Sequence, residues 1–480
     1  MSTPNSPMND LALFDELRST QVQTYDNGQE ISGFERVTIG LTTLGLLGFF
    51  ASFYPPIGRA MGWPGFLAVF GLLGGGAMLW ATATYRGTEP GIKHDGVFFE
   101  KSKTRSYLTY TATVLVTFMY VCLWWWGDWA PQALQHLNPL DGGIALVDPL
   151  SRLMNGGPAD KWFFYTAMYS FAVSVFAVRM FWKYRHNRYH LVRTASVVWF
   201  QTIIAFTLPM LMKNFGTKEH YFNYFWPLKP EYLMPWGVDY ALTFDSIGRS
   251  IVLWTLLVSV VGVPVLTYFF GKRWYCSWIC GCGALAETFG DGWRQMSDKS
   301  ERAWKLERIS IHSVLVIITV LTIGMWANEL TGRAWFSDGQ STTAWKLYTF
   351  FITAGFAGAL GTGFYPVLGN RIWCRFGCPQ AAVLGILQRF FSRFRITTNG
   401  GQCISCGNCS TYCEMGIDVR AYAQRGDNIV RASCVGCGVC AAVCPRGVLK
   451  LENGPVGDRF QGADEPFAEF MRSVGLRSRD

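Results

Sequence analysis

Residues 403–413 read CISCGNCSTYC, and residues 434–445 repeat the pattern as CVGCGVCAAVCP. In each copy, three cysteines recur at intervals of three residues, and a fourth follows four residues after the third. Cysteines at this spacing bind 4Fe-4S clusters, with three ligands from one copy and the fourth from the other. Gly407 and Gly438 provide the tight turns that closely spaced ligands require. The repeat therefore predicts two 4Fe-4S clusters in one small, interlocked α+β ferredoxin-like domain.

The exchange of the fourth ligand divides the eight cysteines between two clusters, which we name cluster I and cluster II. The expected ligands of cluster I are Cys403, Cys406, Cys409 and Cys444. Those of cluster II are Cys434, Cys437, Cys440 and Cys413. Four-cysteine zinc sites use similar pairs, but they rarely need two sets of four at this repeat. The first copy has Glu414 where the second has a proline, which removes no ligand and leaves a change in local geometry or potential open.

The rest of the chain has the composition of a membrane protein. Of its 480 residues, 50% are hydrophobic and only 16% are charged. Apolar stretches of about 20 residues recur, each long enough to cross the hydrocarbon core as a helix. We therefore expect a membrane α-helical bundle of about eight transmembrane helices in contact with lipid, with the ferredoxin-like domain after it. The expected spans are residues 37–54, 63–85, 107–127, 162–182, 193–212, 250–270, 310–328 and 346–368.

The distribution of basic residues predicts the orientation of the bundle. Segments 1–36, 86–106, 183–193 and 271–309 hold about eighteen Lys and Arg, against about nine in the opposite loops. Lys and Arg favour the cytoplasmic side, and an even number of spans returns the chain to that side, so the ferredoxin-like domain is expected to be cytoplasmic. The polar N-terminal region has no signal-peptide pattern. These features favour a multi-pass protein of the inner (cytoplasmic) membrane of a bacterium.

The sequence divides into five parts. They are a cytoplasmic N-terminal segment (1–36), a transmembrane helical domain with long loops (37–370), a boundary cysteine motif with an interfacial helix (371–399), the dicluster domain (400–453) and a C-terminal tail (454–480). We expect the two long outer loops, 129–161 and 213–249, to form interfacial caps because they are rich in Pro, Gly and aromatic residues. The net charge of +9 does not indicate nucleic-acid binding, because Lys and Arg cluster beside the spans.

A second group of cysteines lies where two spans end. CSWICGC at 276–282 follows the sixth expected span, and CRFGCP at 374–379 follows the eighth. A gap of three residues places both cysteines of a pair on one face of a helical turn, and matching positions after two spans let the pairs converge. A third metal centre (iron-sulfur or transient copper), a reversible dithiol and simple packing all stay open. The candidate ligands are Cys276, Cys280, Cys374 and Cys378, and the role of Cys282 is left open.

Residues 250–450 resemble the membrane-bound polyferredoxins that serve nitrate reductase quinol oxidation, nitrous-oxide reductase maturation and cytochrome oxidase maturation. The resemblance is carried by RWYC at 273–276, RIWC at 371–374 and the eight ferredoxin cysteines. In that family, C-x3-C-P motifs flank membrane helices ahead of a dicluster domain. Here the first motif departs, because Gly281 replaces the proline. The resemblance implies redox activity or metal handling at the paired cysteines without choosing between them.

The histidines are a further candidate group. A haem needs an axial ligand, usually His, within the bilayer, and none of the six histidines lies in the middle of a span, so no haem is indicated. Solvated positions near the inner boundary explain most of them. The weaker alternative is a quinone pocket, because a proton acceptor beside aromatic walls suits quinol oxidation. Its candidate residues are His94, His186, His190, His312 and Arg179.

The motifs together indicate one-electron chemistry. We find no nucleotide-binding fingerprint, so a flavin or nicotinamide domain is not expected. Iron-sulfur clusters pass single electrons and perform no hydride transfer unaided. The expected function is an electron-transfer component of an oxidoreductase system, which connects quinol or a cytoplasmic donor with a partner redox protein or respiratory complex. The alternatives are a copper reductase or maturation factor for a respiratory enzyme, and a non-catalytic subunit whose clusters support assembly.

Overall fold

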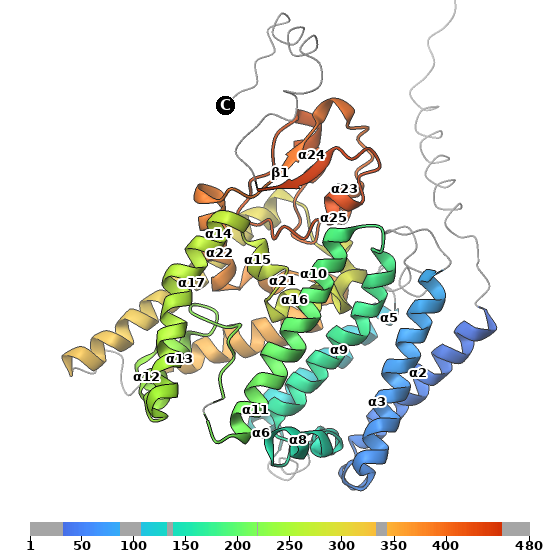
Figure 1. The fold of residues 1–480 in the computed structure, drawn as a ribbon, viewed down its shortest axis with the longest axis vertical. Helices are drawn as coiled ribbons and strands as arrows, with labels where there is room; N and C mark the ends of the chain where they lie inside the picture. The colour runs from blue at the N-terminus through green and yellow to red at the C-terminus, as the bar shows by residue number, and fades with distance from the viewer. Residues whose placement is uncertain (1–31, 87–106, 132–137, 218, 333–342, 454–480) are drawn as a thin grey trace, which may run out of the picture.

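Helices form most of the structure, as the hydropathy predicts. The computed structural model describes residues 32–86, 107–131, 138–217, 219–332 and 343–453. Figure 1 shows an elongated bundle of helices with the cysteine-rich C-terminal domain placed on one end. Within the described residues, six helices are long and apolar enough to cross a membrane. They support a membrane protein, whereas the predicted C-terminal tail lies outside the described part of the chain.

The six long helices match six of the expected spans. They are Gly33–Ser52, Pro55–Arg86, Lys161–Lys183, Arg188–Asn214, Ser246–Phe270 and Glu301–Thr331. The first three are α2, α3 and α9, and the last is α17. The fourth combines α10 (Arg188–Trp199), η3 (Phe200–Thr207) and α11 (Leu208–Asn214). The fifth combines most of α13 (Asp245–Leu257) with η5 (Val258–Gly262) and α14 (Val263–Phe270).

The third and eighth expected spans are less regular. The third corresponds to α5 (Tyr107–Trp124). Its apolar part, Thr109–Trp124, is shorter than the roughly 20 residues that cross a bilayer as a helix. The eighth is divided among α18 (Thr343–Tyr348), η8 (Thr349–Leu360), α19 (Gly361–Gly363) and α20 (Tyr365–Leu368). Gly363 lets this broken segment approach α5, because a Cβ there would lie 2.4 Å from Thr117 Oγ1. A count of eight transmembrane helices therefore stays a prediction.

Small residues bring α2 and α3 together. α2 begins with a capping box. The Ser32 hydroxyl accepts a hydrogen bond from the backbone N–H of Glu35, and the Glu35 carboxylate accepts one from the backbone N–H of Ser32. A Cβ on Gly45 would lie 2.4 Å from Leu73 N, and one on Gly76 would lie 2.5 Å from Thr42 Oγ1. The helix backbones can approach closely only because these glycines have no side chain. The glycine-rich part of α3 is thus explained by packing, as expected.

The two long loops differ in their structure. The first contains α6 (Trp126–Trp129), α7 (Asp141–Leu146) and α8 (Asp148–Asn155), and Figure 1 shows α8 at the end of the bundle opposite the C-terminal domain. That position agrees with the interfacial cap expected for this loop. The second contains η4 (Pro230–Leu233) and α12 (Pro235–Leu242). Its residues 219–233, which we name the inward loop, run into the bundle rather than covering it.

This second loop reaches the first paired-cysteine motif. The hydroxyl of Tyr275 donates to the backbone carbonyl of Asn223 at 2.9 Å, and the Phe225 ring stacks on Trp274 with centroids 6.1 Å apart. Trp226 donates from its indole nitrogen to Thr322 in the middle of α17. Asn223 and Phe225 are each 3% exposed. The expectation of an interfacial cap is therefore wrong for the inward loop, because Asn223 and Phe225 are buried against the first paired-cysteine motif.

Short helices form the boundary between the bundle and the C-terminal domain. They are α15 (Arg273–Cys276), α16 (Gly281–Glu287), η6 (Phe289–Met296), α21 (Ile372–Phe376) and α22 (Pro379–Phe391). α22 is the expected interfacial helix, and it packs against α14 and α17. Leu384 and Gln388 are buried in this contact, whereas Phe390 and Phe391 are exposed. The helix thus joins the bundle to the C-terminal domain.

The C-terminal domain is closed by a two-stranded sheet. β1 (Arg395–Thr398) and β2 (Leu449–Glu452) are antiparallel and pair Arg395 with Glu452. Between them lie η9 (Gly400–Gln402), α23 (Asn408–Thr411), α24 (Val419–Arg425) and α25 (Val439–Ala442). The apolar core of the domain includes Ile396, Ile417, Val435 and Leu449, and it continues into the paired-cysteine motif at Cys276 and Cys280. The domain and the bundle therefore share one core.

Candidate iron-sulfur centres

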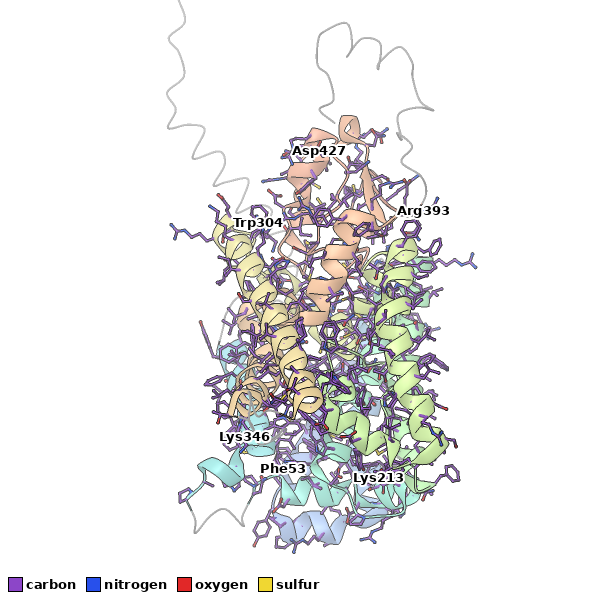
Figure 2. The ribbon with its side chains drawn as sticks, turned by 90° about the vertical axis from the view of Figure 1, so that its left-hand side faces the viewer. Phe53, Lys213, Trp304, Lys346, Arg393 and Asp427 are labelled. Carbon is purple, nitrogen blue, oxygen red and sulfur yellow. The ribbon has the colours of Figure 1, made fainter. Side chains whose placement is uncertain are left out.

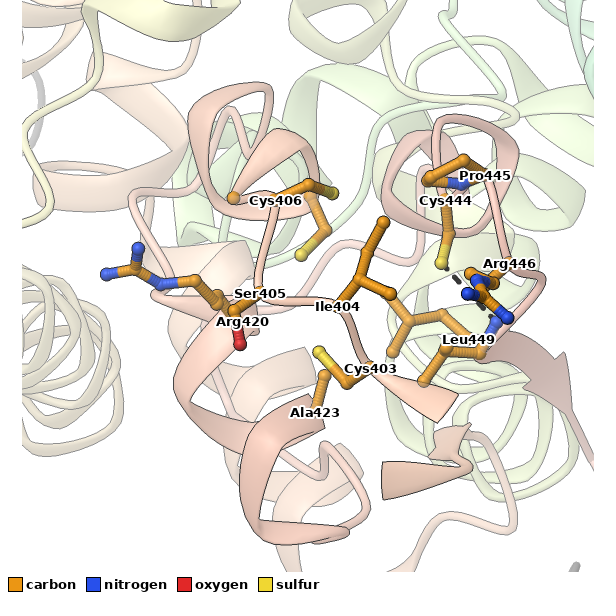
Figure 3. Close-up of a pocket in the computed structure, with 13 residues that line it drawn as sticks. Cys403, Ile404, Ser405, Cys406, Arg420, Ala423, Cys444, Pro445, Arg446 and Leu449 are labelled. Carbon is orange, nitrogen blue, oxygen red and sulfur yellow. Dashed lines mark hydrogen bonds between the residues drawn. The ribbon is translucent and has the colours of Figure 1, made fainter. Parts of the chain in front are cut away.

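The expected ligands of cluster I line one cavity. Cys403, Cys406, Cys409 and Cys444 surround a space of about 360 Å³, shown in Figure 3. Cys406 and the neighbouring Ile404 are exposed. Arg420 and Arg446 also line this cavity. The structure thus brings together three cysteines of the first copy and the fourth of the second, at the surface of the domain.

The expected ligands of cluster II line a second cavity. Cys434, Cys437, Cys440 and Cys413 surround a space of about 370 Å³. Cys434 and Cys440 are each 7% exposed, so this cavity is more deeply buried than the first. Gly407 and Gly438 have φ angles of +79° and +82°, a conformation that favours glycine. The predicted turns are therefore present in both copies.

The donor set of both cavities fits iron-sulfur clusters. Apolar side chains and sulfur atoms form nearly all of the lining. Burial raises the pKa of Cys409 and of Cys434 to about 11, so neither thiol would ionise at neutral pH without a bound cation. Iron supplies that cation, and its bonds to sulfur would also stabilise a domain with a small core. Ligation itself stays a prediction.

The backbone around cluster II is bound to the bundle by side chains. Arg193 donates to the carbonyl of Cys437 at 2.6 Å, and Ser277 donates to that of Val435 at 2.8 Å. Tyr189 donates to Gly436 at 2.8 Å, and Gln388 donates to Cys434 at 2.8 Å. These donors come from α10, the first paired-cysteine motif and α22. Cluster II therefore faces the bundle, and cluster I lies on its outer side.

The paired cysteines occupy matching positions in two local structures. Cys276 ends α15 and Cys280 is the N-cap of α16, while Cys374 lies in α21 and Cys378 is the N-cap of α22. All four are 4% or 5% exposed. The Cys378 sulfur accepts from the backbone of Ala381 at 3.4 Å. The two motifs are thus structural repeats, as the matching spacing suggested.

Electrostatic effects show that the two pairs lie near each other. Burial raises the pKa of Cys276 to about 12, and the Cys280 and Cys374 thiols add to that rise. A hydrogen bond from Cys282 lowers the pKa of Cys280 to about 7. Burial and the thiols of Cys374, Cys280 and Cys276 raise the pKa of Cys378. Five sulfurs, including that of Cys282, therefore form one thiol group.

The spacing of these sulfurs constrains the metal that they could hold. A single tetrahedral ion with metal-sulfur bonds of about 2.3 Å holds its ligands roughly 4 Å apart. In the described residues, no three of the five sulfurs lie within 4.8 Å of one another. No three sulfurs of the ferredoxin cysteines lie so close either, but the Cys437 sulfur lies within 4.8 Å of carboxylate oxygens of Glu287 and Glu414. The five sulfurs are therefore not arranged as the ligands of one tetrahedral ion.

Gly281 accounts for the missing proline in the first motif. A Cβ at this position would lie 2.6 Å from the Tyr224 hydroxyl and 3.3 Å from Gln201 Oε1. Tyr169 also donates from its hydroxyl to the Gly281 carbonyl. The ring of a proline at position 281 would collide with these polar groups. In the second motif, Pro379 occupies the first turn of α22, where proline is well tolerated. The first motif therefore has glycine in place of proline because the inward loop packs closely against it.

A buried ion cluster lies between the paired cysteines and cluster II. Arg294 pairs with Asp291 and with Glu414 at 2.6 Å each, and it also contacts Glu287. Arg371 pairs with Glu287 at 2.7 Å and with Glu414 at 3.0 Å. All five side chains are at most 2% exposed. Sequence analysis did not find this cluster, although Glu414 in place of proline was a signal of it.

Three more cations complete the ion cluster. Lys183 and Arg179 pair with Asp291 at 2.8 and 3.4 Å, and Arg193 pairs with Glu287 at 2.9 Å. Burial alone would raise the pKa of Glu287, but its arginine partners hold that pKa below the usual range. Cations outnumber anions in this cluster. Burial and the carboxylates of Glu414 and Glu287 raise the pKa of Cys437, whereas Arg294 and Arg193 lower it, so both signs of charge act on the expected cluster II.

The residues of the expected quinone pocket do not form one. Arg179 is committed to Asp291, and His190 is fully buried and stacks on Tyr184 with centroids 4.5 Å apart. His312 is exposed on α17. His186 lies in the turn between α9 and α10, and His94 is outside the described residues. For the four described residues the prediction of a shared pocket is therefore wrong, because their positions direct them into different surroundings.

Comparisons with known proteins agree with these sites. A family model described as a 4Fe-4S binding domain matches residues 252–305 and 351–397, which contain the two paired-cysteine motifs. A second, described as a 4Fe-4S dicluster domain, matches residues 402–449. Both regions of the chain thus match iron-sulfur families.

Two curated relatives match about a third of the chain. YccM of Escherichia coli K12, provisionally named an electron transport protein, is 24% identical over 170 residues, which are 34% of this chain and 46% of YccM. The methylamine utilization ferredoxin-type protein MauN of Methylobacillus flagellatus is 26% identical over 171 residues, which are 33% and 54%. The match spans about half the length of these relatives. No solved structure matches. The findings confirm the resemblance to ferredoxin-type electron transport proteins of the membrane polyferredoxin type.

Proposed function

We propose that this chain of the membrane polyferredoxin type passes single electrons between quinol or a cytoplasmic donor and a partner redox enzyme. Iron-sulfur electron transfer is supported by both family models and by the relatives. One observation carries the finer proposal: the order of the sulfur sites. The exposed cluster I cavity, the docked cluster II cavity and the five-thiol group follow one another from the surface of the C-terminal domain into the bundle.

The continuity of packing supports this order. Cys276 and Cys280 share one apolar core with Cys409, Cys434 and Cys440. Ser277 Oγ donates to Val435, so a single residue connects the first motif to the cluster II loop. Electron transfer needs donor and acceptor groups held at a fixed, short separation. A rigid shared core would provide it.

We assign the third site to an iron-sulfur cluster held by Cys276, Cys280, Cys374 and Cys378. The family model described as a 4Fe-4S binding domain covers both motifs, which supports an iron-sulfur cluster at this site. Arg371 donates to the Cys374 sulfur at 3.8 Å and to the carbonyl of Cys276 at 3.0 Å. Hydrogen bonds to sulfur are one of the means by which proteins set cluster potentials. Arg371 is therefore expected to tune this site.

One observation favours the second candidate function, reduction of copper for a respiratory enzyme. The thiol group has five members, so Cys282 would remain free after four cysteines bind a cluster. Thiolates select Cu(I) among the common metals. Copper bound at Cys282 beside a cluster would lie next to an electron source. Copper that remains bound after Cys282→Ser would contradict this candidate.

The proposed location is the inner membrane of a bacterium, with the ferredoxin-like domain in the cytoplasm. The basic segments of the sequence support this side, and a reducing cytoplasm keeps thiols available for metal binding. Cysteine labelling of spheroplasts tests it. A Ser405→Cys variant, placed on the exposed cluster I loop, should be protected from a membrane-impermeant maleimide until the cells are lysed.

The central experiment is a metal count on anaerobically purified protein. Iron, sulfide and copper are measured per chain, and the clusters are reduced with dithionite and followed by electron paramagnetic resonance. About twelve irons indicate three cubanes and about eight indicate two. Material without iron, or with zinc in the ferredoxin cavities, would refute the proposed function. Reduced clusters that fail to pass electrons to any added acceptor protein would favour a role in assembly.

A further inference from the structure

A large cavity lies inside the bundle, separate from both ferredoxin cavities. It holds about 1880 Å³ including its open mouth. Ten of the 23 residues that line it are aromatic, among them Tyr165, Tyr169, Tyr224, Tyr232, Trp236 and Trp373. They come from α9, the inward loop, α12 and α21. Such a concave, mostly apolar space with a few polar groups has the character of a binding site for a small organic molecule.

The inner end of the cavity reaches the five-thiol group through Cys282. Cys282, Trp373 and Pro379 line it there. The Tyr224 hydroxyl lies so close to Gly281 that a Cβ would be 2.6 Å away. Because Gly281 replaces the proline of the C-x3-C-P pattern, tyrosine and glutamine side chains reach the backbone between Cys280 and Cys282. The space beside the thiols therefore depends on this glycine.

The other end of the cavity lies far from the ferredoxin-like domain. Trp236 and Tyr240 of α12 line it, and Figure 1 shows α12 at the end of the bundle opposite the C-terminal domain. Figure 2 marks this end by Lys213 and Lys346, and marks the opposite end by Asp427. The cavity thus extends from the thiols toward the face of the protein that the clusters do not reach.

The lining indicates the chemical class of the occupant. The charged residues of the wall, Glu219, Lys229 and Glu231, come from the inward loop, and Lys229 pairs with Glu231 at 3.1 Å. No histidine lines the cavity within the described residues. A free metal cation would therefore find few ligands besides Cys282. A planar ring would stack on the aromatic side chains, and tyrosine hydroxyls would donate to its carbonyl oxygens.

We propose that this cavity binds the ring of a membrane quinone or quinol, with Tyr224 and Gln201 beside the ring and Cys282 at its inner edge. The inference rests on the proposed function and names its small-molecule redox partner. It also moves the quinone site from the predicted histidines to the inward loop. The ring would lie next to the thiol group, on the side away from cluster II.

Binding is tested on protein in lipid nanodiscs by isothermal titration calorimetry. The probes are menadione, which has a ring without an isoprenoid tail, and ubiquinone-1, and empty nanodiscs give the baseline. We expect saturable binding of one ring per chain for both probes. If only ubiquinone-1 binds, and dodecane competes with it, the site recognises an apolar tail, and the inference is overturned.

Two variants fill the cavity from opposite walls. Ala205 lies on η3 and Ala357 on η8, and both line the space. Ala205→Trp and Ala357→Trp are each expected to weaken menadione binding by about tenfold or more, because the indole occupies the position of the ring. The matched controls are Ile203→Trp on η3 and Leu360→Trp on η8, whose side chains are 43% and 40% exposed. The controls should bind as the parent does.

A conservative variant tests orientation. Tyr224→Phe keeps the aromatic wall and removes the hydroxyl, so menadione binding should weaken roughly fivefold, as expected for one hydrogen bond. If a tryptophan variant fails to fold, Ala357→Leu provides a smaller filling. Equal affinity in the parent and every filled variant overturns the inference. Iron is counted in the same samples, so loss of clusters would refute the proposed function while leaving ring binding measurable.

Discussion

Arg371 and Glu414 form an ion pair of 3.0 Å that joins two parts of the chain far apart in sequence. Arg371 lies in the second paired-cysteine motif and also donates to the Cys374 sulfur, while Glu414 directly follows Cys413 of cluster II. One guanidinium therefore contacts the surroundings of both sites. Arg294 adds a second connection to Glu414 at 2.6 Å. The residue that breaks the common cysteine-proline pattern is therefore one of those that hold the domain against the bundle.

The first prediction concerns this docking. Glu414→Gln leaves two buried arginines short of a carboxylate, and loss of one partner from a buried ion cluster typically costs about 3–5 kcal/mol. Thermal unfolding should show that loss, and limited proteolysis should release the C-terminal domain sooner. Asp427→Asn is the control, because its pair with Arg425 is more than half exposed and should contribute at most about 1 kcal/mol. Equal losses in the two variants would contradict the docking role.

The second prediction concerns the exchange of ligands between the two cysteine repeats. Cys444→Ser should reproduce the paramagnetic resonance spectrum of Cys406→Ser, because both residues line the cluster I cavity. Cys413→Ser should instead reproduce Cys437→Ser, since both line the cluster II cavity. The comparison requires no prior assignment of the signals. If Cys444→Ser matched Cys437→Ser, each repeat would supply all four of its own ligands, and the assignment would be wrong.

The third prediction concerns the paired cysteines. Cys276→Ser and Cys374→Ser should each lower the iron content from about twelve to about eight per chain, because each removes a ligand of the proposed third cluster. Cys282→Ser should leave the iron content unchanged. Cys122→Ser is the matched control, since Cys122 is 1% exposed and belongs to a different core cluster. Iron that stays near eight in the parent and in every variant would leave these cysteines with a thiol or packing role.

The fourth prediction concerns Gly281. Gly281→Ala places a Cβ 2.6 Å from the Tyr224 hydroxyl, closer than van der Waals contact allows, so it should destabilise the protein by about 1–3 kcal/mol, as overpacking usually does. Tyr224→Phe removes that hydroxyl and should recover part of the loss. A double-mutant cycle on thermal stability measures the coupling. Additive effects would show that the two residues do not press on each other.

Local patterns were sufficient for much of the fold. Cluster ligands lie within a few residues of one another, so the spacing of the cysteines predicted both cavities and the positive φ of Gly407 and Gly438. Of the eight spans that the hydropathy predicted, six are helices long and apolar enough to cross a membrane within the described residues. The paired motifs were found for the same reason. In each case the physical constraint acts between near neighbours or along one helix.

The sequence alone determined the kind of chemistry, because closely spaced thiols admit few metals and long apolar helices admit few environments. Only the tertiary structure decided where that chemistry is placed. It carried Phe225 into the bundle against Trp274 and gathered Glu287, Arg371 and Glu414 from three distant segments. Such contacts depend on how the helices pack. Periodicity in a sequence shows which face of one helix is buried, but it does not show which distant residue packs against that face.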